Sequence, residues 1–119
     1  MTPYEVVLFL ELVRCAHAER RLVYRRTRDK NMQTLIDLGW KPSDMLDFVA
    51  ALRPESALGL PRTNQHPDHS DELVCEFGCE HEGPAIYVKI AVVGLESGTS
   101  GCVVSFHFAE KPFVFPFDQ

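Results

Sequence analysis

The most constraining feature of this sequence is a pair of apolar segments between Ala85 and Lys111. One segment reads Ala-Ile-Tyr-Val-Lys-Ile-Ala-Val-Val and the other Cys-Val-Val-Ser-Phe-His-Phe. β-Branched and aromatic residues favour strands, and a segment rich in Gly and Ser favours a turn. The pattern therefore predicts a β-hairpin whose turn runs from Gly94 to Gly101.

Side chains of a strand alternate between its two faces, so the hairpin has a predictable inner and outer surface. The apolar face is expected to contain Ile86, Val88, Ile90 and Val92 from the first strand and Cys102, Val104, Phe106 and Phe108 from the second. The opposite face carries Tyr87, Lys89, Ser105 and His107. Any register that keeps the apolar faces together places Tyr87 and His107 on neighbouring strands, within side-chain reach. Such a face suits phosphate chemistry, although a polar outer face is also ordinary for an antiparallel sheet.

The length and composition limit the class of protein. The 119 residues predict a single domain, residues 1–119, with enough chain for a hydrophobic core. No apolar segment approaches the roughly 18–20 residues of a membrane helix, and no basic segment precedes an apolar one at the N-terminus. We therefore expect a cytoplasmic protein with no membrane association, whose four cysteines are reduced.

The charge distribution is uneven. The net charge of −5 opposes nonspecific nucleic-acid binding, but six of the twelve basic residues lie between Arg20 and Lys30. This local cluster includes Arg25 and Arg26, at the end of the segment Leu-Val-Tyr-Arg-Arg. Such a segment is typical either of a charged edge strand or of a strand that contacts phosphates.

Apolar periodicity predicts the remaining elements. Residues 3–18, 31–38 and 42–52 have the spacing of amphipathic helices, and residues 20–26 and 72–77 that of short strands. Residues 78–84 are expected to turn the chain into the hairpin. The order of helix, strand, two helices and three strands predicts an α+β fold, with three helices packed on a small antiparallel sheet.

Two segments have no regular periodicity. Residues 53–71 contain three prolines together with Arg62, His66 and His69, and a loop of this length is usually functional. The C-terminal segment contains two prolines, which exclude a central strand. Its phenylalanines, Phe113, Phe115 and Phe117, are expected with Phe108 to cover the first helix or a partner.

These motifs together resemble the MqsR family of mRNA-interferase toxins, which have a RelE-like fold. The resemblance covers roughly residues 6–111. It rests on Leu-Val-Tyr-Arg-Arg, Leu-Ile-Asp-Leu-Gly, Met-Leu-Asp-Phe-Val-Ala-Ala-Leu, Ile-Tyr-Val-Lys-Ile and Val-Val-Ser-Phe-His, in this order. It implies a toxin of a type II toxin–antitoxin system that cleaves single-stranded mRNA and is silenced by a protein antitoxin. A homodimer is left open.

The resemblance also implies site residues. Tyr87 matches a family Tyr, His107 stands where classical members carry a Lys, and Glu76 lies near a family Gln. A further family lysine has no match, and Arg62 is the nearest substitute. We therefore predict Tyr87, His107 and Lys89 as catalytic, without a metal or cofactor. Arg25, Arg26, Arg62 and Lys111 are predicted to bind RNA.

The expected reaction is cleavage through attack by the 2′-hydroxyl, which gives a 2′,3′-cyclic phosphate. Histidine is the natural proton carrier, since its unperturbed pKa is about 6.5, so His107 is expected to act as general acid or base. Tyr87 would orient the phosphate or carry the second proton. Lys89, Arg25 or Arg26 would hold the phosphate.

Three alternatives stay open at this point. Cys75, Cys79 and His81, with His66 and His69 nearby, are residue types that bind zinc, although their spacing is not that of a zinc knuckle. The acidic charge and the Phe-rich tail would suit a non-catalytic protein-binding module. A cysteine nucleophile is the third alternative, but the sequence shows no convincing partner histidine for it.

Overall fold

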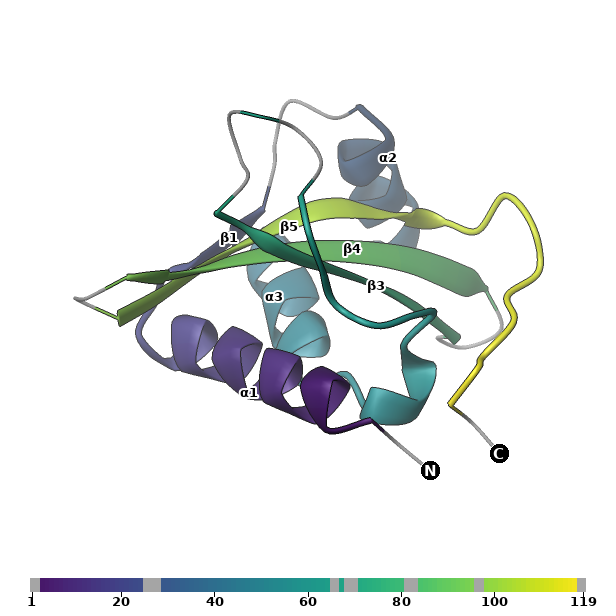
Figure 1. The fold of residues 1–119 in the computed structure, drawn as a ribbon. Helices are drawn as coiled ribbons and strands as arrows, with labels where there is room; N and C mark the ends of the chain where they lie inside the picture. Colours follow the sequence, from purple (N-terminus) through teal and green to yellow (C-terminus); the bar gives the residue numbers. More distant parts are fainter. Residues whose placement is uncertain are drawn as a thin grey trace.

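The computed structural model describes residues 3–24, 29–64, 67, 71–80, 84–95 and 98–117. It is an α+β fold in which helices cover a five-stranded sheet (Figure 1). The helices are α1 (Tyr4–Ala18), α2 (Asp29–Leu38) and α3 (Pro42–Ala50), followed by the short 3₁₀ helix η1 (Pro54–Ser56). The strands are β1 (Leu22–Tyr24), β2 (Arg62–Thr63), β3 (Leu73–Glu80), β4 (Ala85–Leu95) and β5 (Gly98–Phe108).

The sheet has the order β1-β5-β4-β3-β2 and is mixed. The prediction of an antiparallel sheet was therefore wrong for one pair of strands. β1 runs parallel to β5, while the other three pairs are antiparallel. Periodicity alone does not reveal the direction of a three-residue strand, which depends on how α1 returns the chain to the sheet. The predicted loop of residues 53–71 contributes η1 and the edge strand β2.

Several strand boundaries differ from the prediction. β3 continues to Glu80, so Gly78 belongs to the sheet instead of the turn. The hairpin strands extend to Leu95 and restart at Gly98, so most of the predicted turn is paired strand. Backbone pairing with a long neighbouring strand compensates for the weak strand preference of Gly and Ser.

A bulge in β5 changes which side chains face the core. The pairing passes from Lys89↔Ser105 to Ile90↔Val103, which leaves Val104 as the extra residue. Val103 and Phe106 therefore both face the helices, whereas Cys102 and Val104 pack on the opposite face. The prediction that Cys102 and Val104 share a face with Phe106 was wrong, because the extra residue of a bulge interrupts the alternation of side chains between the two faces.

The edge of β5 beyond β1 is covered by a side chain. Asn31 of α2 is 1% exposed, donates from Nδ2 to the carbonyl of Val104 (3.1 Å) and accepts at Oδ1 from the N–H of Phe106 (2.9 Å). The carboxamide thus makes the two hydrogen bonds that a neighbouring strand would have made. This contact holds α2 against β5.

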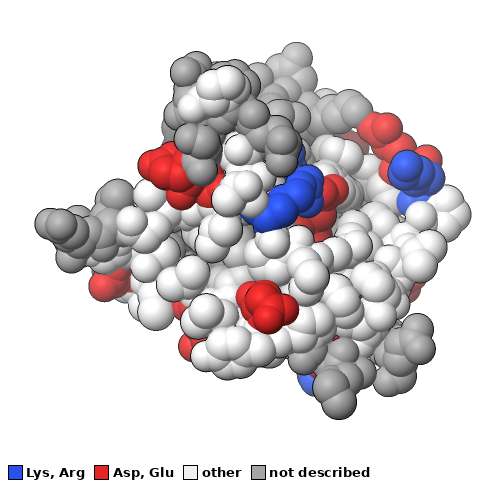
Figure 2. Space-filling model, viewed as in Figure 1, with Lys and Arg blue, Asp and Glu red and all other residues white. Residues whose placement is uncertain are grey.

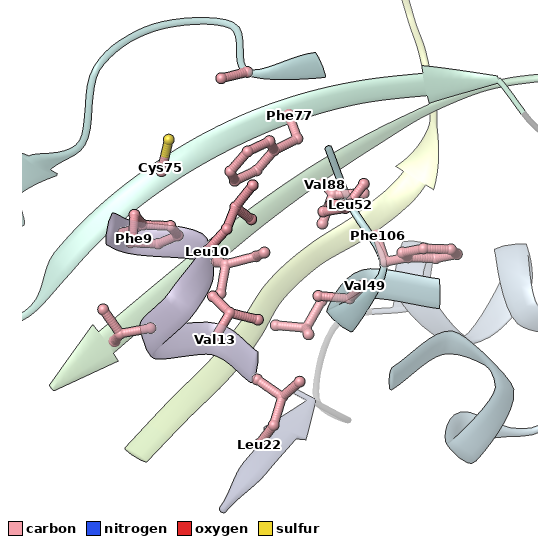
Figure 3. Packing of buried hydrophobic residues seen from close by; sticks show 14 of the residues in the cluster. Phe9, Leu10, Val13, Leu22, Val49, Leu52, Cys75, Phe77, Val88 and Phe106 are labelled. Carbon is pink, nitrogen blue, oxygen red and sulfur yellow. The ribbon is translucent and has the colours of Figure 1, made fainter. Parts of the chain in front are cut away.

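The core lies between the sheet and helices α1 and α3 (Figure 3). Figure 3 shows Phe9, Leu10 and Val13 of α1 directed towards Phe77 of β3 and Val88 of β4. All five side chains are almost inaccessible to solvent. Because α1 and α3 occupy this face, the side chains of β3, β4 and β5 that alternate with the core residues project from the other face.

The tail, residues 109–117, leaves the end of β5 and passes the ends of β3 and β4 towards the start of α1 (Figure 1). Phe108 and Phe117 pack against the main core, which confirms part of the predicted covering role. Phe113 instead packs on the outer side of β3 at Gly78. In the described part of the chain, no helix has the length and apolarity needed to cross a membrane.

Candidate functional site

Tyr87 and His107 form a cross-strand pair on the outer face of the sheet. They lie directly opposite each other in the β4–β5 register, and their ring centroids are 5.1 Å apart with the planes inclined at 34°. The prediction that pairing of these strands brings the phenol and the imidazole together is confirmed. It holds because Tyr87 and His107 lie on the same side of the bulge, in a stretch of the β4–β5 ladder where the pairing is regular.

Glu76 of β3 is the residue that connects this pair to the rest of the site. Its Oε2 accepts a 2.6 Å hydrogen bond from the Tyr87 hydroxyl, and its Oε1 accepts one of 2.6 Å from Arg62. Its side chain is 29% exposed, so solvent screens these contacts only in part. Arg62 stands on the edge strand β2, opposite Val74, which directs it over the same face.

The charge state of Glu76 follows from these partners. Burial acts to raise the pKa of the carboxyl, but it is outweighed by the hydrogen bonds from Tyr87 and Arg62 and by the positive charges of Arg62 and Lys89. The pKa of Glu76 therefore lies below its ordinary value. The site holds a carboxylate that is ionised at neutral pH and already accepts two hydrogen bonds.

Lys89 lies opposite both Glu76 and Ser105 in the two registers. It is two residues along β4 from Tyr87, and its positive charge acts on Glu76. The structure therefore places Lys89 beside the Tyr87–His107 pair, in a position that influences the carboxylate.

His107 is oriented by a backbone contact. Its Nδ1 lies 2.9 Å from the carbonyl oxygen of Phe108. A carbonyl oxygen can only accept, so Nδ1 must carry a proton. The remaining ring nitrogen, Nε2, is then the atom available to gain or lose a proton.

Glu76, Tyr87 and His107 line an open cavity of about 600 Å³. Its polar part consists of Glu76, Tyr87, His107, Glu110 and Lys111. Its apolar part comes from Leu58 and the tail residues Pro112, Phe113 and Val114. Five of the seven residues predicted to act on RNA are thus close to one site. Tyr87, His107 and Lys111 line the cavity, and Arg62 and Lys89 act on Glu76, a carboxylate that lines it.

The other predicted RNA-binding residues, Arg25 and Arg26, lie outside the described residues. Figure 2 shows one face of the molecule, on which the Lys and Arg atoms of the described chain form small patches beside Asp and Glu atoms. This face has no continuous basic surface among the described residues. Any polyanion bound there would depend on a few local cations.

The sequence analysis placed Glu76 near a family Gln without giving it a role, and it expected Phe113 to cover the first helix or a partner instead of lining the site. Glu76 could have been found from the alternation of β3, which places it on the face opposite Cys75 and Phe77. The position of Phe113 has no comparable signal, because a Pro-rich segment without periodicity does not indicate where it packs.

Cys75 and Cys79 are poor candidates for chemistry. Burial raises the pKa of both Cys75 and Cys79 to about 12, so both thiols are neutral at physiological pH. Cys75 is buried in the core, with Sγ 3.6 Å from the carbonyl oxygen of Gly59. Among the described residues, no three His, Cys, Asp or Glu side chains are arranged to hold a metal ion. His66, His69 and His81 lie outside the described residues.

Comparison of this chain with protein-family models, with curated proteins and with solved structures finds no match.

Proposed function

We propose that this protein is a metal-independent endoribonuclease that cleaves single-stranded mRNA, and the toxin of a type II toxin–antitoxin pair. The observation that carries the proposal is the Tyr87–His107 pair, joined to the ionised Glu76, on the wall of an open cavity. An imidazole, a phenol and a carboxylate supply the proton donors and acceptors that phosphodiester cleavage needs. The motifs that resemble the MqsR family support the same reaction.

The proposed reaction begins with the 2′-hydroxyl of a ribose. Glu76 takes the proton of this hydroxyl as its oxygen attacks phosphorus, and the bond from phosphorus to the 5′-oxygen breaks. His107 gives the proton on Nε2 to the leaving 5′-oxygen. The products are a 2′,3′-cyclic phosphate and a 5′-hydroxyl, and the two proton transfers balance.

The remaining residues would position the phosphate. The Tyr87 hydroxyl exchanges its hydrogen bond to Glu76 for one to a phosphate oxygen. Lys111, on the cavity wall, and Arg62, which reaches Glu76, neutralise charge that develops on the phosphorane. Charge-assisted hydrogen bonds to phosphate are strong, and arginine can make two at once.

The direct test is RNA cleavage by purified protein and its His107→Ala and His107→Gln variants. Loss of a general acid is expected to lower the cleavage rate by about 10²- to 10⁴-fold. Tyr4→Ala is a suitable control, since Tyr4 is 72% exposed and lies on α1, away from the cavity. Cleavage by both His107 variants at the rate of the unaltered protein would remove His107 from the mechanism.

A non-catalytic protein-binding module is the second candidate. It is favoured by the engagement of Arg62 and Tyr87 with Glu76, by the net charge of −5 and by the exposed Val114 on the tail. Growth on expression separates the two candidates. Toxicity that disappears with Tyr87→Phe or His107→Ala indicates an enzyme, whereas toxicity that persists in both indicates binding. A small neighbouring gene for a DNA-binding protein would support the proposed antitoxin partner.

A further inference from the structure

The apolar wall of the cavity is built by the tail and not by the sheet. Pro112, Phe113 and Val114 line it, together with Leu58 from the segment that precedes β2. The polar lining consists of Tyr87, His107 and Lys111 together with the carboxylates of Glu76 and Glu110. One cavity therefore presents an aromatic, apolar surface together with polar and charged side chains.

The position of Phe113 depends on a glycine. Gly78 is buried in β3, and a Cβ on it would lie 2.6 Å from Cδ2 of the Phe113 ring. The ring thus occupies the space above the strand that any other residue would fill. Gly78 is directly opposite Tyr87 in the β3–β4 register, so the ring lies beside the proposed reaction centre.

The Phe113 ring is packed against a neighbouring ring but remains partly exposed to solvent. Phe115 contacts it edge-on, with centroids 5.8 Å apart and planes inclined at 60°. Phe113 is half-buried, and part of its surface lines the cavity. A fixed, partly exposed aromatic ring of this kind is a platform on which a planar group can stack.

We propose that Phe113 stacks on a nucleobase of single-stranded RNA adjacent to the cleaved phosphate; this inference rests on the proposed function. Proteins recognise single-stranded RNA by stacking unpaired bases on aromatic side chains while polar groups hold the backbone. The two surfaces of the cavity match these two parts of a nucleotide. A volume of about 600 Å³ is within the range of small-molecule sites.

The test measures binding without cleavage. The probe is a fluorescent 2′-O-methyl hexanucleotide, which lacks the attacking hydroxyl, and the second probe is an abasic backbone of the same length. Phe113→Ala is expected to weaken binding of the first probe by roughly 5- to 150-fold, the range of one base–aromatic stack. It should change binding of the abasic probe less than twofold, and Phe113→Tyr should bind both probes as the unaltered protein does.

Matched controls separate stacking from folding. Tyr4→Ala removes an exposed aromatic ring outside the cavity and should bind both probes normally. Circular dichroism and thermal unfolding show whether Phe113→Ala retains the fold. If Phe113→Ala binds the hexanucleotide with unchanged affinity, or loses affinity equally for the abasic probe, the stacking role is overturned.

The outcomes also distinguish this inference from the proposed function. Binding that depends on Phe113, with no cleavage of ordinary RNA by the unaltered protein, would support the base site and contradict the nuclease. Cleavage that depends on His107 but not on Phe113 would support the nuclease and contradict the base site. Failure of the unaltered protein to bind the hexanucleotide overturns the base site, whatever the cleavage assay shows.

Discussion

The hydroxyl of Tyr87 donates a 2.6 Å hydrogen bond to Glu76, although the two residues are not directly opposite each other on their strands. Tyr87 pairs with Gly78, and Glu76 pairs with Lys89, so the contact is diagonal. A tyrosine is long enough to reach a diagonal neighbour, and the missing side chain at Gly78 leaves the direct position to Phe113. The absence of a side chain at Gly78 thus leaves room for the Phe113 ring beside the diagonal hydrogen bond from Tyr87 to Glu76.

Removal of the Tyr87 hydroxyl should affect activity more than stability. Tyr87→Phe loses one charge-assisted hydrogen bond, which is expected to cost about 1 kcal/mol of unfolding free energy because Arg62 still binds Glu76. If the hydroxyl orients the phosphate, RNA cleavage should fall by about 10²-fold. Urea unfolding and a cleavage assay measure the two effects, with Tyr4→Phe as the control. Undiminished cleavage by Tyr87→Phe would contradict the role given to the hydroxyl.

The contribution of Glu76 to stability should depend on pH. Its folded-state pKa is below the ordinary value of 4.5, so the unfolded chain binds a proton more readily than the folded protein does. The stabilisation is complete above pH 4.5 and is lost as the pH falls through the lower, folded-state pKa. Glu76→Gln should therefore cost about 1 kcal/mol at pH 7 and progressively less below pH 4.5.

Urea unfolding of the unaltered protein and of Glu76→Gln, from pH 7 to below pH 4.5, checks this prediction. Glu55→Gln is a suitable control, because Glu55 lies on η1 and its ion pair is with Arg53, whose side chain is 82% exposed. A difference between the unaltered protein and Glu76→Gln that stays constant with pH would mean that ionisation of Glu76 is not linked to folding.

Gly78→Ala should be destabilising only while Phe113 is present. The added methyl would lie 2.6 Å from the ring, and such overpacking costs about 1–3 kcal/mol. The double variant Gly78→Ala, Phe113→Ala should be no less stable than Phe113→Ala alone, since the clashing ring is gone. Gly94→Ala is the matched control in β4, because a Cβ there meets no atom within 4 Å. Additive losses in the double variant would contradict this packing.

Asn31 is expected to be among the costliest polar residues to replace. Asn31→Ala leaves the carbonyl of Val104 and the N–H of Phe106 without their side-chain partner, which should cost about 2–4 kcal/mol. Gln33→Ala on the same helix removes an exposed hydrogen bond to Asp37 and should stay within about 0.5 kcal/mol. Thermal or urea unfolding compares the two. Equal stability of both variants would show that the edge of β5 does not need the carboxamide.

The thiols should differ sharply in reactivity. Cys75 and Cys79, with pKa values of about 12, have roughly one thiolate in 10⁴ molecules at pH 8. Cys15 is exposed on α1 and should react first with a thiol reagent, and Cys15→Ser should abolish that fast reaction. Peptide mapping after timed labelling of the native protein identifies the sites. Fast labelling of Cys75 or Cys79 would reopen the thiol alternative.

The sequence alone was sufficient for the three α-helices and for the central pair of the candidate site. Apolar spacing located α1, α2 and α3, and Gly39, with φ of +72°, ends α2 as a residue without a Cβ can. The placement of Tyr87 opposite His107 also followed from alternation. These features depend on the period of a helix or a strand, and this period is visible in the spacing of apolar residues along the sequence.

Only the tertiary structure decided the parallel placement of β1, the bulge at Val104 and the convergence of Glu76, Arg62 and Phe113 around Tyr87. Glu76 and Tyr87 are eleven residues apart, and Phe113 reaches Gly78 from the tail that follows β5. Such contacts depend on strand register and on space left by a missing side chain. Neither quantity has a period along the chain, so only packing in three dimensions determines it.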